Sequence, residues 1–209
     1  MQGFTFDINV PLASWATGGH AVVPTDQQPT WSAIVGMMGA ALGLPRGDER
    51  LVRLSADYAL ALVDKGGRGV LTDFHTVQSP KESPELKDAN PHTRREELES
   101  GEVEPSITRR DYLCGASYQI FIVQVAEHPV FAPAEIQAAM VNPVYPLSAG
   151  RRSCLIGRVQ ARPFDAQMLD RCTHWDARIP LDKPSSLVRE RRDQLIGPRR
   201  FGVRMEHVA

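Results

Sequence analysis

The sequence has few cysteines, few lysines and no long apolar run. Its three cysteines, Cys114, Cys154 and Cys172, are far apart and form no Cys-x-x-Cys pair. A sparse, odd set of this kind argues against a disulfide framework and suits a reducing compartment. No apolar segment is long enough to span a bilayer, and the first residues alternate in polarity, unlike a signal peptide. We therefore expect a cytoplasmic protein with no membrane partner.

Motifs for common cofactors are also missing. The chain contains no Walker loop and no Gly-x-Gly-x-x-Gly. The segment Cys-Thr-His at 172–174 offers two metal ligands, whereas a structural zinc site requires four. We therefore expect no cofactor and no metal site.

Net charge is small, but its distribution is uneven. The formal net charge is −1, yet residues 151–209 carry 13 Lys and Arg against 7 Asp and Glu. The basic residues comprise 20 Arg and only 4 Lys, and a guanidinium group suits phosphates and stacking on bases. This composition indicates an anionic partner for the C-terminal part, or simply the codon usage of a GC-rich genome.

Periodicity predicts an order of elements. Alternating apolar residues predict strands, and apolar residues at helical spacing predict helices. We expect strands at 3–10, 57–63, 70–77 and 107–125, with helices at 31–44 and 132–142. The tight turn at 65–69 predicts that 70–77 returns as the hairpin partner of 57–63.

This order predicts an α+β fold class, with a ferredoxin-like (RRM-like) βαββαβ domain at residues 1–154. A proline-rich and charge-rich insertion at about 78–106 interrupts it and is too polar to build a core of its own. Residues 155–209 are expected to form a small, basic, β-rich C-terminal subdomain. The sheet of an RRM-like domain is a common platform for RNA.

Paired arginines are the strongest candidates for binding. Arg151 and Arg152, followed by Ser153, lie in a glycine-containing loop without acidic residues, which favours phosphate binding. Arg109 and Arg110 precede Tyr112, which places charge beside a surface for stacking. The alternative for any such pair is a solvated surface that is paired with carboxylates.

Two further features leave alternatives open. Thr30 and Ser32, at a helix start, could cradle a phosphate with free backbone N–H groups, or Thr30 could serve as a plain cap. His75 could form an acid–base pair with Tyr112 or Tyr118 that cleaves RNA without metal, or it could be a strand residue satisfied by local hydrogen bonds.

Four blocks in order, PTDQQPTWSAIVGMMGAALGL, LTDFHTVQ, ITRRDYLC and PVYPLSAGRRSC, resemble the Cas-five family (RAMP superfamily), subunits of type I-E CRISPR Cascade complexes in antiviral defence. The resemblance implies a ferredoxin-like domain with a protruding thumb at about 78–106. It implies a noncatalytic subunit that binds the 5′ handle of CRISPR RNA. Its implied partners are the CasC backbone subunit, the CasA large subunit and, within the assembled ribonucleoprotein, target DNA.

The resemblance also suggests roles for individual residues. It places Arg109 and Arg110 on a strand that faces the handle, and Arg151, Arg152 and Ser153 in a phosphate-binding loop. Thr30 and Ser32 match the family's helix start, and His75 matches its "FHTV" strand. Trp15 remains from the family's Gly-Pro-x-Gln-x-Trp opening, whose Gly and Gln are missing here, and is expected to contact RNA. Trp31 stands where a basic residue is frequent and could instead stack on a base.

Some type I-C relatives cleave the precursor RNA themselves. The main alternative is therefore a metal-independent endoribonuclease that processes precursor CRISPR RNA. A third possibility is a protein–protein scaffold without direct RNA contact.

Overall fold

The computed structural model describes residues 1–16, 18, 21–66, 69–80, 95–96 and 103–209. Its strands are β1 (Gly3–Ala13), β2 (Val22–Val23), β3 (Tyr58–Asp64), β4 (Gly69–Pro80), β5 (Val103–Gln124), β6 (Arg162–Pro163), β7 (His174–Asp176), β8 (Leu187–Gly197) and β9 (Arg200–Val208). Its helices are α1 (Trp31–Ala41), α2 (Glu49–Asp57), α5 (Pro133–Val141) and the 3₁₀ helix η1 (Ala166–Arg171). The predicted mixture of helices with a sheet is confirmed.

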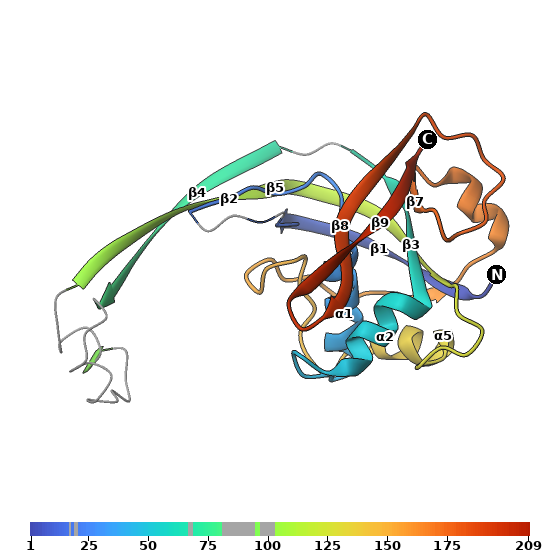
Figure 1. Ribbon diagram of the computed structural model, residues 1–209, viewed down its shortest axis with the longest axis horizontal. Helices are drawn as coiled ribbons and strands as arrows, with labels where there is room; N and C mark the ends of the chain where they lie inside the picture. The colour runs from blue at the N-terminus through green and yellow to red at the C-terminus, as the bar shows by residue number, and fades with distance from the viewer. Residues whose placement is uncertain (17, 19–20, 67–68, 81–94, 97–102) are drawn as a thin grey trace.

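The described strands form one sheet, in the order β6-β1-β5-β3-β7-β9-β8, and β2 and β4 also pair with β5. The pairs are antiparallel apart from β2 with β5. The period-two pattern of β1 is confirmed, because Phe4, Phe6 and Ile8 are fully buried on one face. That face packs against α1 and α5, and helices α1, α2 and α5 lie on the same side of the sheet (Figure 1).

The helices start and end where local chemistry allows. The Thr30 side chain accepts a hydrogen bond from the Ala33 N–H and caps α1. The helix ends at Ala41, before the predicted end at residue 44, because Gly43 adopts a left-handed φ of +73°. The sequence analysis missed α2, which Asp48 caps by accepting from the Arg50 N–H.

The opposite face of the sheet carries a second, smaller apolar cluster. Phe121 and Val123 of β5 contribute to it together with Ala59 and Ala61 of β3. Residues of the C-terminal part, including Trp175 of β7, cover these side chains.

The predicted hairpin between 57–63 and 70–77 is wrong. β3 pairs with β5 and β7, whereas β4 pairs with β5 from Gly69, opposite Cys114, to Pro80, opposite Val103. β4 and this half of β5, with the short β2 paired to the other edge of β5, form a ribbon that extends away from the helices (Figure 1), here called the β4–β5 arm. The predicted insertion at 78–106 falls largely on 81–94 and 97–102, which lie outside the described residues.

The C-terminal strands continue the same sheet. β7 pairs with β3 through Ala61 opposite Trp175, and β8 and β9 follow at the edge. The division into domains at 154/155 stays a prediction. Within the described ranges, no helix has the length and apolar character needed to cross a bilayer.

Candidate nucleic-acid interface

A groove of about 960 Å³ lies between three segments that are distant in the sequence. One wall is the turn between α1 and α2 with Arg46, and another is the 146–155 loop with Arg151 and Arg152. The third wall is the turn between β8 and β9 with Arg199. We call it the arginine groove. Its floor is largely apolar and includes Met37, Leu44, Leu51, Leu155 and Leu195.

The four guanidinium groups of the groove are not neutralised by carboxylates. Within the described part of the chain, no carboxylate lies within ion-pair distance of Arg46, Arg151, Arg152 or Arg199. The acidic residue of the lining, Asp48, instead pairs with Arg50 at 2.7 Å. Hydrogen bonds from Arg50 hold the pKa of Asp48 at about 2. The groove therefore presents a net positive surface to an anion.

Backbone contacts fix the loop that carries Arg151 and Arg152. The Ser14 N–H donates to Ala149 O at 3.0 Å, and the Cys154 N–H donates to Arg151 O at 2.9 Å. Gly150 has a φ of +86°, and a Cβ there would lie 1.8 Å from the Ser14 carbonyl oxygen. Glycine is therefore required at this position. The loop holds its two arginines at the groove, and Ser153 beside them is exposed.

Arg109 and Arg110 point to opposite faces of the β4–β5 arm, as neighbours on a regular strand must. The Arg109 guanidinium lies 4.8 Å from the ring centroid of Phe74, its cross-strand partner. Arg110 Nε donates to Thr108 Oγ1 at 3.1 Å on the other face.

Tyr112, two residues beyond Arg110, shares that face and links the arm to the groove. Its hydroxyl accepts a hydrogen bond from Arg151 Nη1 at 2.6 Å, which fixes the Arg151 side chain at one end of the groove. Tyr112 is 6% exposed, so its ring offers little surface for stacking on a base. The structure thus brings Arg110, Tyr112 and Arg151 onto one side and leaves Arg109 on the other. The two arginine pairs do not form a single surface.

Trp15 and Trp31 were expected to contact RNA, and this prediction is wrong because both side chains are buried. Both side chains are 0% exposed. Trp15 Nε1 donates to the Tyr118 hydroxyl at 3.3 Å, and Trp31 Nε1 donates to Ser55 O at 3.1 Å. Both indole groups are core residues with satisfied polar atoms, so neither is available to stack on a base.

Two of the N–H groups at the start of α1 that were expected to form a phosphate cradle are engaged within the protein. The Trp31 N–H donates to Asp193 Oδ2 at 2.8 Å, and the Ala33 N–H is capped by Thr30. A carboxylate thus already occupies the favourable position at the helix N-terminus. Thr30 and Ser32 nevertheless line the arginine groove.

The expected acid–base pair of His75 with a tyrosine is not assembled. His75 Nε2 pairs with Asp73 at 2.7 Å, and the residue lies opposite Thr108 on the arm. Tyr112 lies four positions further along β5, which corresponds to about 13 Å along a strand. Tyr118 is fully buried and donates its hydroxyl to Gln27 O.

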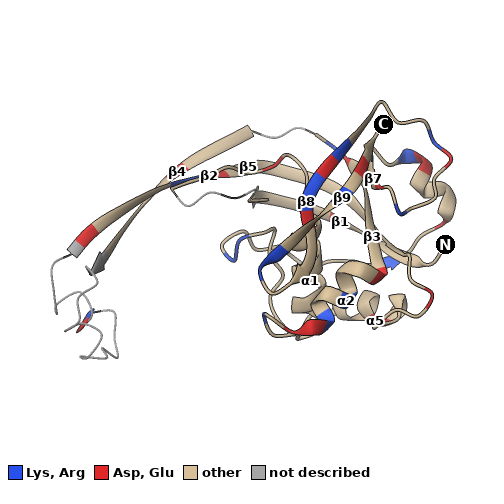
Figure 2. Cartoon of the chain, in the orientation of Figure 1, with Lys and Arg blue, Asp and Glu red and all other residues tan. Residues whose placement is uncertain are grey.

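Part of the C-terminal arginine excess is neutralised within the protein. Arg191 and Arg204, 7% and 4% exposed, lie among buried carboxylates. Figure 2 shows that basic and acidic residues both occur along β8 and β9. Burial alone would lower the pKa of Arg204, but Asp193, Glu206 and Asp176 together raise it. These arginines stabilise the β8–β9 hairpin, so the positive balance of residues 151–209 overstates the charge available to a partner.

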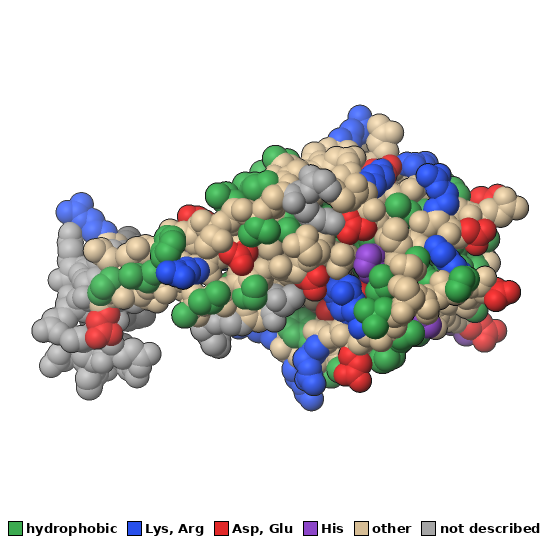
Figure 3. All heavy atoms as spheres, turned by 90° about the horizontal axis from the view of Figure 1, so that it is seen from above, with side chains coloured by type: hydrophobic (Ala, Val, Ile, Leu, Met, Phe, Trp, Pro, Cys, Tyr) green, Lys and Arg blue, Asp and Glu red, His purple; other side chains and the backbone are tan. Residues whose placement is uncertain are grey.

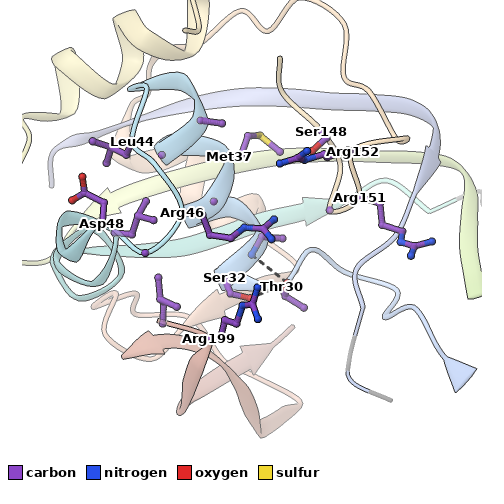
Figure 4. Close-up of a pocket in the computed structure, with 18 of the residues that line it drawn as sticks. Thr30, Ser32, Met37, Leu44, Arg46, Asp48, Ser148, Arg151, Arg152 and Arg199 are labelled. Carbon is purple, nitrogen blue, oxygen red and sulfur yellow. Dashed lines mark hydrogen bonds between the residues drawn. The ribbon is translucent and has the colours of Figure 1, made fainter. Parts of the chain in front are cut away.

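Sequence reasoning missed Arg46 and did not select Arg199 as a site residue. Figure 4 shows both within the groove, with Arg152 at its far wall and Arg151 to one side. Arg46 follows Leu44-Pro45 in the turn after α1, and Arg199 follows Pro198. Neither position has a local signal for phosphate binding, although the Arg199-Arg200 doublet is visible in the sequence.

Comparison with known proteins agrees with the geometry. A family model described as CRISPR-associated protein (Cas_Cas5) matches residues 3–187. The CRISPR system Cascade subunit CasD of Escherichia coli (strain K12) is 31% identical over 154 residues. This match covers 69% of the present chain but only 62% of the length of that relative.

Solved structures share the fold. A chain of a CRISPR RNA-guided surveillance complex gives a TM-score of 0.70 at 21% identity, covering 99% of this chain and 89% of that one. The crystal structure of a Cas protein gives a TM-score of 0.55 at 21% identity, covering 98% and 93%. The family match runs from the first strand to the start of β8, so it includes strands β1 to β7 and helices α1, α2 and α5. The chain therefore belongs to the CRISPR-associated Cas_Cas5 family, as its sequence blocks predict.

Proposed function

We propose that this chain is a noncatalytic subunit of a CRISPR Cascade surveillance complex that binds the 5′ handle of CRISPR RNA in the arginine groove. The observation that carries the proposal is the set of four guanidinium groups without carboxylate partners around one groove, in a chain of the Cas_Cas5 family. The E. coli relative is itself named a Cascade subunit. Such a complex would operate in the cytoplasm.

The groove suits a single-stranded RNA better than a small anion. Its arginines come from three separate segments around a volume of about 960 Å³, which is large for one phosphate. Each phosphate contact releases condensed counterions, and a single strand contributes a salt slope of about −0.7 per contact. The apolar floor adds a surface for a base or ribose between the phosphate contacts.

The strand order supports a ferredoxin-like core. The order β6-β1-β5-β3, with α1 and α2 between β1 and β3 and α5 between β5 and β6, is the arrangement of a βαββαβ unit. In this interpretation the β4–β5 arm is the base of the family's thumb.

The arm also fits a protein partner. It exposes large apolar side chains, among them Phe74 at 60% and Ile107 at 59% (Figure 3). Surfaces of this kind mark contacts between proteins. We propose that they contact the CasC backbone subunit and the CasA large subunit, in an assembly that also engages target DNA.

The experiment uses labelled CRISPR repeat RNA and the full chain. The double variant Arg151→Ala/Arg152→Ala should weaken binding by at least about tenfold and reduce the salt slope by about 1.4, because two phosphate contacts are lost. The matched control is Arg171→Ala/Arg192→Ala, which removes the same charge from exposed positions outside the groove. Unchanged binding and an unchanged salt slope in the groove variant would favour a scaffold that does not touch RNA.

The same RNA tests the absence of cleavage. The unassembled geometry around His75 supports a binding role, so the RNA should remain intact in EDTA. Specific cleavage that is lost in His75→Ala would replace the proposal with a metal-independent endoribonuclease.

A further inference from the structure

The turn between β8 and β9 forms one wall of the arginine groove, although it lies beyond the residues matched by the family model. That match ends at residue 187, where β8 begins. Gly197, Pro198, Arg199 and Phe201 all line the groove. The turn therefore lies outside the segments that the family model matches, although the structural match to the surveillance-complex chain covers 99% of this chain.

Arg199 has a backbone conformation that disfavours its residue type. Its φ is 54°, and it is the one non-glycine residue with a positive φ in the described part of the chain. Pro198 and Arg199 occupy the two central positions between Gly197 and Arg200. Proline followed by a positive φ is the pattern of a type II turn, whose second position normally carries Gly or Asn. An arginine at such a position suggests a role for its side chain.

The β8–β9 hairpin is anchored, so the position of the turn does not depend on a ligand. Asp193 of β8 accepts from Arg204 Nε at 2.7 Å and from the Trp31 N–H at 2.8 Å. The Leu195 N–H donates to Ser55 Oγ at 3.0 Å. These bonds connect β8 to β9, to the start of α1 and to α2.

Arg46 projects into the same groove from the turn between α1 and α2 (Figure 4). Both Arg46 and Arg199 are exposed and have no carboxylate partner among the described residues. Asp48, the nearby acid of the lining, is engaged by Arg50. Two free guanidinium groups from separate turns can bind one phosphodiester or two successive ones.

We propose that Arg199 and Arg46 form a phosphate clamp that holds the RNA backbone across the groove from Arg152. The C-terminal hairpin is thus part of the RNA site, and Arg199 is kept in a strained turn for this contact. This inference deepens the proposed function and rests on it.

The test is Arg199→Gly, assayed with CRISPR repeat RNA over a series of salt concentrations and by thermal unfolding. Glycine relieves the positive φ, so the melting temperature should stay the same or rise by up to about 4 °C. Binding should nevertheless weaken by about five- to tenfold, and the salt slope should fall by about 0.7. The combination of equal or higher stability with weaker binding is not expected of a structural residue.

Two variants serve as controls. Arg200→Ala removes the same charge one position away, at a residue outside the groove lining, and should change binding by less than about twofold. Arg199→Lys keeps a positive charge and should retain most of the salt slope, even if the glycine variant unfolds more easily. The clamp is overturned if Arg200→Ala weakens binding as much as Arg199→Gly, or if Arg199→Lys shows the same slope as Arg199→Gly.

The outcomes also separate this inference from the proposed function. If Arg151→Ala/Arg152→Ala loses RNA but Arg199→Gly binds like the unchanged protein, the clamp is overturned and RNA binding in the groove stands. If both variants bind RNA like the unchanged protein, RNA binding in the groove is itself refuted.

Discussion

Replacing Asp193 with alanine should destabilise the packing of the C-terminal hairpin on the rest of the chain. The loss of unfolding free energy should be larger than for a substitution at an exposed position. The Asp193 carboxylate is buried and accepts hydrogen bonds from Arg204 Nε at 2.7 Å and Arg204 Nη2 at 3.0 Å. It also accepts from the Trp31 N–H at 2.8 Å. Its removal leaves a buried guanidinium and a buried N–H without this acceptor.

The magnitude follows from that loss. Removing one partner of a buried ion pair costs about 3–5 kcal/mol of unfolding free energy. For a chain of this length each kcal/mol lowers the melting temperature by about 2–4 °C, so Asp193→Ala should lower it by roughly 6–20 °C. Asp193→Asn keeps one acceptor oxygen and should fall between alanine and the unchanged protein.

Chemical denaturation followed by circular dichroism gives the unfolding free energy directly. The comparison is Lys65→Ala, which removes the partly exposed pair of Lys65 with Asp7 at 2.9 Å. Exposed pairs contribute about 0.2–1 kcal/mol. A loss in Asp193→Ala no larger than the loss in Lys65→Ala would refute the view that this carboxylate anchors the hairpin.

Three further predictions concern other positions. Gly150→Ala should cost about 2 kcal/mol or more in denaturation experiments, because its Cβ would lie 1.8 Å from a carbonyl oxygen; Gly157→Ala, with open space around it, should cost much less. Burial raises the pKa of the Cys172 thiol to about 12, so mass spectrometry should find native Cys172 unalkylated by iodoacetamide near neutral pH, and rapid labelling would contradict this. Burial lowers the pKa of His174 from its ordinary 6.5; the unfolded chain then binds the proton more tightly, so the unfolding free energy should fall as pH drops below about 6.5, and His174→Gln should flatten that dependence.

The sequence predicts elements with strong periodicity and predicts their partners poorly. The strand at 3–10 and the helix starting near Thr30 are local features, and both are confirmed. The strand at 70–77 could pair with the preceding strand at 57–63, if the chain folds back at once, or with the later strand at 107–125. The candidate partners at 57–63 and 107–125 are both apolar or alternating, so periodicity does not distinguish between them. The short turn at 65–69 therefore favoured the wrong pairing.

The burial of Trp31 could have been anticipated. Trp31, Ile34 and Met38 recur at helical spacing, which places them on one face of α1. Because Ile34 and Met38 belong to the core, the tryptophan on the same face had to be buried as well. The matching family position is frequently basic, and this resemblance led to the prediction that Trp31 is exposed and stacks on a base.

The candidate site depends on contacts that no local pattern records. Arg151 and Arg152 lie in a loop with a visible glycine and no acid, so the sequence indicates them. Arg46 is a single arginine and Arg199 is the first of a doublet, in turns that are separated by more than half of the chain. Only the packing of β8 against α1 and α2 brings them together.

The C-terminal arginines divide into two groups with different physical roles. Arg191 and Arg204 are buried among carboxylates, where a permanently charged, multidentate donor can satisfy several acceptors at once. Arg199 is exposed, has no carboxylate partner among the described residues and lies at the tip of the hairpin that the buried pair anchors. A charge count over residues 151–209 does not distinguish the arginines that are paired inside the protein from those that are exposed. Their separation explains how a segment with an internal ion network can still present positive charge to an RNA, because the network fixes the position from which the free arginine acts.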